Sequence, residues 1–226
     1  MIISAVIIIA YTSVGGFLAA STTDLIQSIV MTLALIILVI FGIDAAGGVD
    51  TVMNNAKGLT DYLSFTALHD PETGGSSPYS ALSIASLLAW GLGYFGMPHI
   101  ILRFMAIKDK NKIKTSRRIA SVWVVISMAV AIFIGFIGNL LSKQGTIENL
   151  ADSETIIIKI ALFMSEHGAL LAIIAGLVFA GILACTMSTS DSQLLAASSS
   201  MSENILKGVF KVKMNEKQSM LSARAV

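Results

Sequence analysis

The segment Trp90-Gly91-Leu92-Gly93-Tyr94-Phe95-Gly96-Met97-Pro98-His99 lies inside a strongly apolar run that extends from Ala81 to Met105. Its three glycines and one proline weaken a continuous helix, because glycine costs backbone entropy and proline removes a hydrogen-bond donor and clashes with the preceding turn. A membrane tolerates a broken helix only where the freed backbone groups face protein or a wet cavity. The segment therefore predicts a broken membrane helix, which transporters use to hold substrate near the middle of the bilayer.

Two aromatic side chains give this segment a candidate binding surface. Trp90 and Tyr94 are four residues apart, so they share one face of a helix. Two rings and Pro98 beside unwound backbone suit a small, partly apolar zwitterion. A glycine-mediated contact between helices, with the aromatic residues at the interface, explains the same pattern without a ligand.

The composition is that of a polytopic membrane protein. Of the 226 residues, 55% are hydrophobic and 13% are charged, whereas soluble domains carry about 25% charged residues. The net charge of +1 gives no indication of a nucleic-acid partner. The single cysteine, Cys185, excludes an internal disulfide framework, and the three histidines lack the spacing of a metal-ligand motif.

Hydropathy divides the chain into five predicted membrane crossings, each long enough to span a bilayer at about 1.5 Å of rise per residue. The crossings cover residues 2–20, 25–43, 81–105, 119–141 and 169–206. A further apolar segment, residues 156–164, is shorter and is predicted to form an interfacial or re-entrant helix.

The charges of the connecting segments predict the orientation of the chain in the membrane. Residues 106–118 carry six basic residues and one acidic residue, so the positive-inside rule places this loop in the cytoplasm. Residues 45–80, which include Glu72, and residues 142–155 carry more acidic than basic residues and are predicted outside. The first crossing then enters from outside. The basic loop lacks the aromatic residues of a nucleic-acid platform.

Small and polar residues connect the first two predicted crossings. The pair Gly15-Gly16 indicates close packing of helices through small residues. The run Ser21-Thr22-Thr23-Asp24 is typical of the N-terminal cap of a helix. Asp24 is therefore predicted to be a capping carboxylate at a membrane boundary.

A polar block, Cys185-Thr186-Met187-Ser188-Thr189-Ser190-Asp191-Ser192-Gln193, interrupts the last apolar crossing. Cys185, Ser188 and Ser192 share one helix face. The adjacent hydroxyls of Ser188 and Thr189, with a carbonyl one turn earlier, offer the oxygen ligands that a hard cation such as Na⁺ prefers. The same hydroxyls can instead bond to carbonyls of their own helix. Asp191 is either a buried functional carboxylate or a residue wetted by water at the cytoplasmic end.

Three separate stretches of the chain resemble the sodium:solute symporter family, and most closely its sodium/proline symporter branch. The first combines Gly91 to Gly96 with Pro98-His99-Ile100 and Arg103-Phe104-Met105-Ala106. The second combines Tyr11-Thr12, Gly15 to Ala19 and Thr23-Asp24. The third combines Met187-Ser188-Thr189 with Gln193-Leu194-Leu195. The stretches occur in the family's order and extend over nearly the whole chain.

The resemblance implies an all-α, LeuT-like inverted-repeat fold and sodium-coupled uptake of L-proline. It implies that Trp90, Tyr94 and Pro98 line the substrate pocket. It implies that Na⁺ binds the hydroxyls of Ser188 and Thr189 and the backbone oxygen of Cys185.

The resemblance also ranks residues beside these two sites. Asp24, near the cytoplasmic exit of sodium, and Gly93, within the matched string, are secondary candidates, as is Asp191. Met97 stands where a glutamine often stands, which leaves the substrate less defined. His99 is predicted to be a structural hydrogen-bond donor.

Several expectations follow from this resemblance. The protein is expected to be a multi-pass protein of the cell membrane, surrounded by lipid, with Na⁺ and proline as its ligands, no nucleic-acid partner and no enzymatic activity. Family members have more crossings than this chain, so the chain is expected to be truncated and inactive by itself. A symporter for pantothenate, a carboxylate or a sugar, a transporter-like sensor and a structural membrane subunit remain as alternatives.

Overall fold

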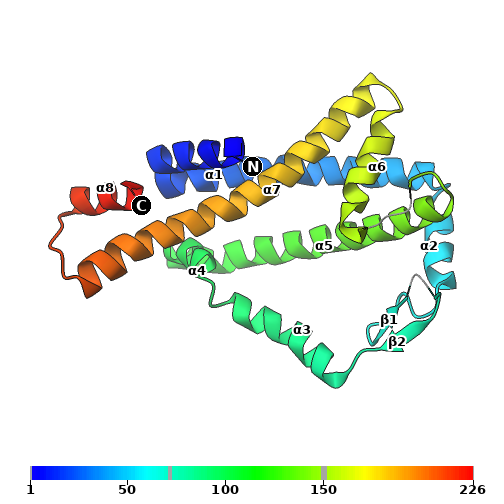
Figure 1. Ribbon diagram of the computed structural model, residues 1–226, viewed down its shortest axis with the longest axis horizontal. Coiled ribbons are helices and arrows are strands. Elements are labelled where there is room, and N and C mark those ends of the chain that lie inside the picture. The colour runs from blue at the N-terminus through cyan, green and yellow to red at the C-terminus, as the bar shows by residue number, and fades with distance from the viewer. Residues whose placement is uncertain (1, 71–72, 149–151, 226) are drawn as a thin grey trace. The chain divides into compact units, whose positions relative to one another are not determined.

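The computed structural model describes residues 2–70, 73–148 and 152–225, which are mainly helical (Figure 1). Glu72 and residues 149–151, assigned above to the outer loops, lie outside the described residues. The elements are, in order, α1 (Ile2–Ala45), α2 (Val49–Gly58), β1 (Ala67–His69), β2 (Ser76–Pro78), α3 (Ala81–Tyr94), α4 (Pro98–Met105), η1 (Lys110–Lys112), α5 (Ile113–Lys143), η2 (Ser153–Thr155), α6 (Ile156–Ser165), α7 (Ala169–Ser199), η3 (Ser200–Val209) and α8 (Glu216–Ala225). The prediction of an all-α fold is confirmed.

The chain forms two units, and α1 and α7 each contribute a part to both. The first unit contains residues 2–30, 95–110 and 181–225. The second unit contains residues 31–94 and 111–180.

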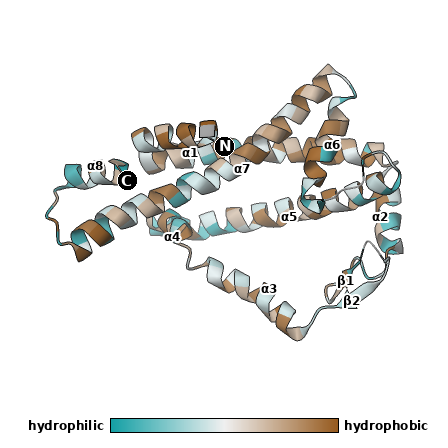
Figure 2. Ribbon diagram, in the orientation of Figure 1, coloured by the Kyte–Doolittle hydropathy of each residue, from teal (hydrophilic) through white to brown (hydrophobic). Residues whose placement is uncertain are grey.

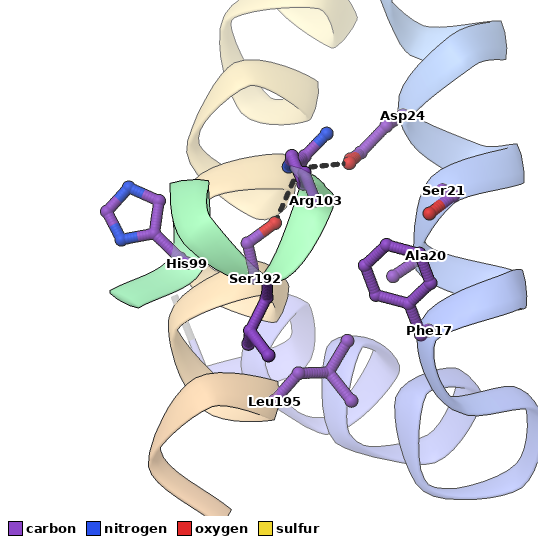
Figure 3. Close-up of a pocket in the computed structure, with 9 residues that line it drawn as sticks. Phe17, Ala20, Ser21, Asp24, His99, Arg103, Ser192 and Leu195 are labelled. Atoms are coloured by element: carbon purple, nitrogen blue, oxygen red, sulfur yellow. Dashed lines mark hydrogen bonds and ion pairs between the residues drawn. The ribbon is translucent and has the colours of Figure 1, made fainter. Parts of the chain in front are cut away.

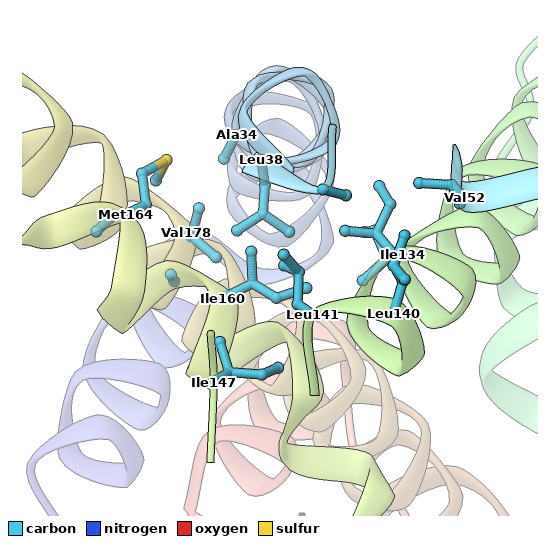
Figure 4. Close-up of a cluster of buried hydrophobic side chains, with 14 residues drawn as sticks. Ala34, Leu38, Val52, Ile134, Leu140, Leu141, Ile147, Ile160, Met164 and Val178 are labelled. Atoms are coloured by element: carbon cyan, nitrogen blue, oxygen red, sulfur yellow. The ribbon is translucent and has the colours of Figure 1, made fainter. Parts of the chain in front are cut away.

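The second unit has an apolar core between the later part of α1, α5, α6 and the beginning of α7 (Figure 4). Leu38, Ile134, Leu141, Ile160 and Met164 are each at most 1% exposed in this core. Near it, the side-chain amide of Asn55 on α2 donates a hydrogen bond of 2.9 Å to Asn139 Oδ1 on α5. The segment expected to be an outer loop, residues 45–80, thus contains α2 and the short antiparallel β1–β2 hairpin.

Three helical segments of the described chain are long and apolar enough to cross a membrane: Ile3–Ala45, Lys110–Lys143 and Ala169–Val209. The pair α3 and α4 gives a fourth when it is counted as one broken span. Apolar residues recur along α1, α5 and α7 (Figure 2), and many of their large apolar side chains are exposed, as lipid-facing residues are. The chain is a multi-pass integral membrane protein.

The first two predicted crossings fall within α1, which breaks at Gly16. Gly16 has φ 56° and ψ −146°, a left-handed region that is open mainly to glycine. The sequence-based interpretation of Gly15-Gly16 as a packing contact did not include this break, which Gly16 makes in the helix. Ser21 to Asp24 lie inside the helix, where the Thr23 hydroxyl donates to the carbonyls of Ala19 and Ala20. The prediction of a cap there is wrong.

The predicted interruption between Ala81 and Met105 is confirmed. The helix continues through Gly91 and Gly93, ends at Tyr94 and resumes at Pro98, with Met97 in an extended conformation. Proline suits the first turn of a helix, because the N–H that it lacks would have no partner there. The proline thus marks the point at which the chain becomes helical again.

The helix α7 continues beyond Ser199 as η3, a π-helical segment of ten residues. In this winding each N–H reaches the carbonyl five residues earlier, as the bond of 3.0 Å from Phe210 N to Ile205 O shows. The short helix α8 contacts η3, where Ser219 and Lys207 both donate to the Glu203 carboxylate.

We expect Gly138→Ala to destabilise the protein by about 1–3 kcal/mol, as overpacking of a filled core does. A Cβ at Gly138 on α5 would lie 1.9 Å from Ile156 Cδ1 and 2.3 Å from its Cγ1. Gly135→Ala on the same helix is the matched control, because its Cβ would meet no atom within 4 Å. Thermal unfolding in detergent measures both variants, and equal Tm values for the two would contradict this packing.

Candidate functional site

Polar side chains of the first unit form one continuous network, the polar network, made of Tyr11, Asp24, Arg103, Asp191 and Ser192. The Arg103 guanidinium donates to Asp24 Oδ2 and to Ser192 Oγ, both at 2.6 Å. Ser192 Oγ lies 3.3 Å from Asp191 Oδ1, and the Tyr11 hydroxyl donates to Asp191 Oδ2 at 2.7 Å. The network links both parts of α1 on either side of Gly16 with α4 and α7.

Asp191 is the most deeply buried charged residue of this network, with 0% of its surface exposed. Its two oxygens are the acceptors for Tyr11 and Ser192. A buried carboxylate is costly unless hydrogen bonds or an opposite charge compensate it. Tyr11, 180 residues away in the sequence, therefore has a clear energetic role at this position.

Arg103 connects α4 to the rest of the first unit. The Asp24 side chain is 11% exposed and the Arg103 side chain is 45% exposed, so the ion pair is partly shielded from its surroundings. In Figure 3 the guanidinium lies between Asp24 on α1 and Ser192 on α7. Asp24 is thus the partner of Arg103 rather than the helix cap predicted from the sequence.

A small cavity lies beside this ion pair. Its volume of about 10 Å³ is close to the space of a single water molecule. Phe17, Ala20, Asp24, His99 and Leu195 are among its lining residues (Figure 3). The second carboxylate oxygen of Asp24, Oδ1, is buried without a hydrogen-bond partner among the described residues. This oxygen is free to accept a further donor or to bind a cation.

The three candidate sodium ligands lie on α7, between two and six residues before Asp191. The Thr189 hydroxyl donates to the backbone carbonyl of Cys185 at 3.2 Å, which is the alternative that the sequence left open for this residue. Ser188 is half-buried and Thr189 and Cys185 are exposed. The hydroxyl of Thr189 and the carbonyl of Cys185 therefore stand next to each other.

The candidate substrate residues are divided between the two units. Trp90 and Tyr94 belong to the second unit and stack on each other, with ring centroids 5.3 Å apart. They are 71% and 46% exposed, and Gly93 between them has no atom near its missing side chain. Pro98 belongs to the first unit, where it begins α4. The stacked pair confirms that Trp90 and Tyr94 share a helix face.

Among the described residues, no group of three or more histidine, cysteine, aspartate or glutamate side chains is placed to hold a metal ion. His99 lines the cavity beside Arg103.

Sequence reasoning missed Tyr11, Arg103 and Ser192 as members of a site. The sequence did contain an indication for two of them, because Tyr11 and Arg103 stand in apolar stretches, where a polar side chain needs a partner. The sequence could not show which partner each one has, since Arg103 is 79 residues from Asp24 and 89 from Ser192.

The fold and these buried polar groups define a multi-pass helical membrane protein with a charged network between its helices. The model of the sodium:solute symporter family matches residues 1–226 of the chain, and the chain belongs to this family.

Curated relatives extend this assignment to a branch of the family. The chain is 37% identical over 219 residues to the high-affinity proline transporter PutP of Bacillus subtilis, which covers 96% of the chain and 43% of that relative. It is 34% identical over 237 residues to sodium/proline symporter 2 of Staphylococcus saprophyticus, covering 99% of the chain and 41% of that relative. It is 33% identical over 224 residues to the osmoregulated proline transporter OpuE of Bacillus subtilis. That match covers 99% of the chain and 42% of the relative.

The chain thus spans about two fifths of the length of the curated relatives it matches. No solved structure matches the chain.

We expect Arg103→Gln to lower the free energy of unfolding by about 1–2 kcal/mol, because it leaves the largely buried Asp24 carboxylate without its cation. The loss is smaller than for a fully buried ion pair, since the Arg103 side chain is half-exposed. Asp24→Asn added to Arg103→Gln should recover part of this loss. Thermal unfolding of both single variants and the double variant measures the coupling, which we expect to be about 1 kcal/mol.

Arg117→Gln, at an exposed position of α5, is the control for loss of a positive charge. Strictly additive effects of Arg103→Gln and Asp24→Asn would show that the two side chains do not stabilise each other.

Proposed function

We propose that the protein takes part in sodium-coupled uptake of L-proline. Support comes from its family and from relatives that are named proline transporters and sodium/proline symporters. Na⁺ and proline would both be transported ligands, and no covalent bond would form or break.

One observation carries the sodium part of this proposal. The Thr189 hydroxyl oxygen and the Cys185 carbonyl oxygen are 3.2 Å apart on α7. Two oxygens that bind one hard cation at about 2.4 Å and at a right angle lie about 3.4 Å apart. In the structure the two oxygens are joined by a hydrogen bond, which a cation binding to both of them would replace, and the half-buried Ser188 next to them is proposed as the third ligand.

The proline part of the proposal is supported by the stacked rings of Trp90 and Tyr94 and by the helix break that follows them. Aromatic faces suit the apolar pyrrolidine ring of proline. The resemblance to the family adds Pro98, at the first position of α4, as a separate candidate for contact with the substrate.

Coupling would arise because both ligands favour the same conformer. If Na⁺ and proline bind that conformer better than its alternative, each ligand raises the affinity for the other by the same factor. Alternating access would then expose the sites first to one side of the membrane and then to the other. We propose that the basic segment 106–118 faces the cytoplasm, so that uptake follows the sodium gradient inward.

The test is uptake of labelled proline by a chimera in which residues 1–226 replace the matching part of the Bacillus subtilis proline transporter. We expect uptake that requires a sodium gradient. Ser188→Ala should raise the sodium concentration for half-maximal uptake at least about tenfold, because a lost ligand costs more than about 1.4 kcal/mol. Trp90→Ala should raise the proline KM and leave the sodium dependence at saturating proline unchanged.

Two variants control this experiment. Ser190→Ala removes a neighbouring hydroxyl whose bond of 2.8 Å is to the Thr186 carbonyl, and Leu88→Ala shortens another exposed side chain of α3. Both should behave as the parent chimera does. A correctly inserted chimera that accumulates another solute would refute proline as the substrate, and uptake without sodium would refute the ion assignment.

A further inference from the structure

We propose that residues 207–217, here called the lysine turn, bind the phosphate groups of anionic phospholipids at the membrane surface. The lysine turn runs from the last turn of η3 to the first turn of α8. It carries four basic residues against one acidic residue. The basic residues are Lys207, Lys211, Lys213 and Lys217. Lipid binding of this kind requires neither sodium nor proline, so the proposal goes beyond the proposed function.

The first step is the place of the lysine turn in the chain. The helical segment that is long and apolar enough to cross a membrane ends at Val209. The residues that follow it therefore leave the hydrocarbon layer at the depth of the lipid headgroups. Basic residues clustered directly after a membrane helix attract anionic lipid, and each of them adds about fivefold in affinity.

The second step is the charge that the lysine turn leaves available. Lys207 donates to both oxygens of Glu203, at 2.8 and 3.0 Å, so its charge is compensated. Lys211 and Lys213 are exposed, and neither forms an ion pair with any residue that the structure describes. The three lysines line one open hollow of about 550 Å³, a volume typical of sites for small molecules. A phosphate group in this hollow would meet two uncompensated ammonium groups.

The third step is the backbone of Lys211. Its φ of 54° lies in the left-handed region that favours glycine. The residue that ends a helix in this conformation is usually glycine, and here the N–H of Val212 bonds to the Leu206 carbonyl at 3.0 Å and closes the end of η3. Glycine would therefore serve the fold better than lysine does. The lysine at this position indicates a use for its charge.

The fourth step is the apolar side chains among the lysines. Val209, Phe210 and Val212 are 70%, 67% and 45% exposed. Apolar side chains interleaved with basic ones suit the boundary between acyl chains and headgroups, where both kinds find a partner. A soluble acidic partner would match the lysines and leave the apolar side chains in water. The membrane surface matches both.

The far end of the lysine turn is fixed by a capping box. The Asn215 N–H donates to Gln218 Oε1 at 3.0 Å, and the Gln218 N–H donates to Asn215 Oδ1 at 2.8 Å. With the bond from Val212 to Leu206, hydrogen bonds thus hold the segment on both sides of Lys213. The two uncompensated lysines are therefore presented by a turn of defined shape.

The experiment measures thermal unfolding of the 226-residue chain in dodecylmaltoside micelles that contain phosphatidylglycerol or phosphatidylcholine with the same acyl chains. A ligand that binds the folded protein raises its Tm. We expect phosphatidylglycerol to raise the Tm more than phosphatidylcholine does. Sodium chloride at about 0.5 M should reduce this difference, because salt screens exposed charges.

Two variants test the lysines. Lys211→Gln combined with Lys213→Gln should increase the fraction of phosphatidylglycerol needed for a given rise in Tm about twentyfold, as two losses of about fivefold. Lys211→Gly should have two opposite effects. Its Tm without lipid should be higher, since glycine suits φ 54°, and its response to phosphatidylglycerol should be about fivefold weaker. A lysine that served only the fold would not separate these effects.

Lys57→Gln, at an exposed position of α2, is the matched control and should respond to phosphatidylglycerol as the parent does. An equal rise in Tm with both lipids, or a parental response in the double variant, would overturn the proposal. If the double variant does not fold, Lys211→Gly decides, and an undiminished lipid response in that variant contradicts the proposal.

Two soluble anions distinguish a lipid surface from other partners. Inorganic phosphate and polyglutamate are each added to micelles without phosphatidylglycerol. A rise in Tm with phosphate as large as that with the lipid would show a site for a free anion, and such a rise with polyglutamate would show a site for an acidic peptide. Either result would refute the lipid surface, whereas a response to phosphatidylglycerol alone would support it.

Discussion

The pair between the Arg103 guanidinium and Asp24 is the interaction on which the first unit depends. Arg103 lies on α4, a helix of eight residues in which no residue is buried. So short a helix is marginal by itself, and it needs contacts with other segments to keep its place. Arg103 supplies such contacts with two hydrogen bonds of 2.6 Å, one to α1 and one to α7. The segment after the helix break is therefore positioned by charge more than by apolar packing.

The two units are stabilised by different forces. The second unit buries a group of large aliphatic side chains between α1, α5, α6 and α7. The first unit instead encloses Asp191, Ser192 and Thr12, all at most 9% exposed. Between helices in a membrane, apolar side chains gain little by leaving lipid, and hydrogen bonds add specific contacts. Polar contacts can also be exchanged for contacts with an ion or a substrate, which an aliphatic core does not allow.

The sequence predicted the parts of this structure that depend on local chemistry. The all-α fold, the interruption before Pro98 and the beginning of the helix α6 at Ile156 all follow from hydropathy, glycine and proline. The break at Gly16 was missed because a glycine pair serves equally well for close packing and for a turn. The partners of Asp24 and Asp191 were missed because they come from distant parts of the chain, and spacing in the sequence holds no information about such contacts.

The π-helical segment η3 has a consequence for how the chain tolerates changes in length. A π-helix accommodates one more residue per turn than its α-helical neighbours need, so it behaves as an absorbed insertion. Deleting one residue from Ser200–Val209 would let about one turn of the segment return to α-helical winding. The same deletion between Cys185 and Asp191 would turn the preceding residues by about 100° relative to those that follow. Insertions and deletions should therefore accumulate in η3 while the length of the polar block stays constant.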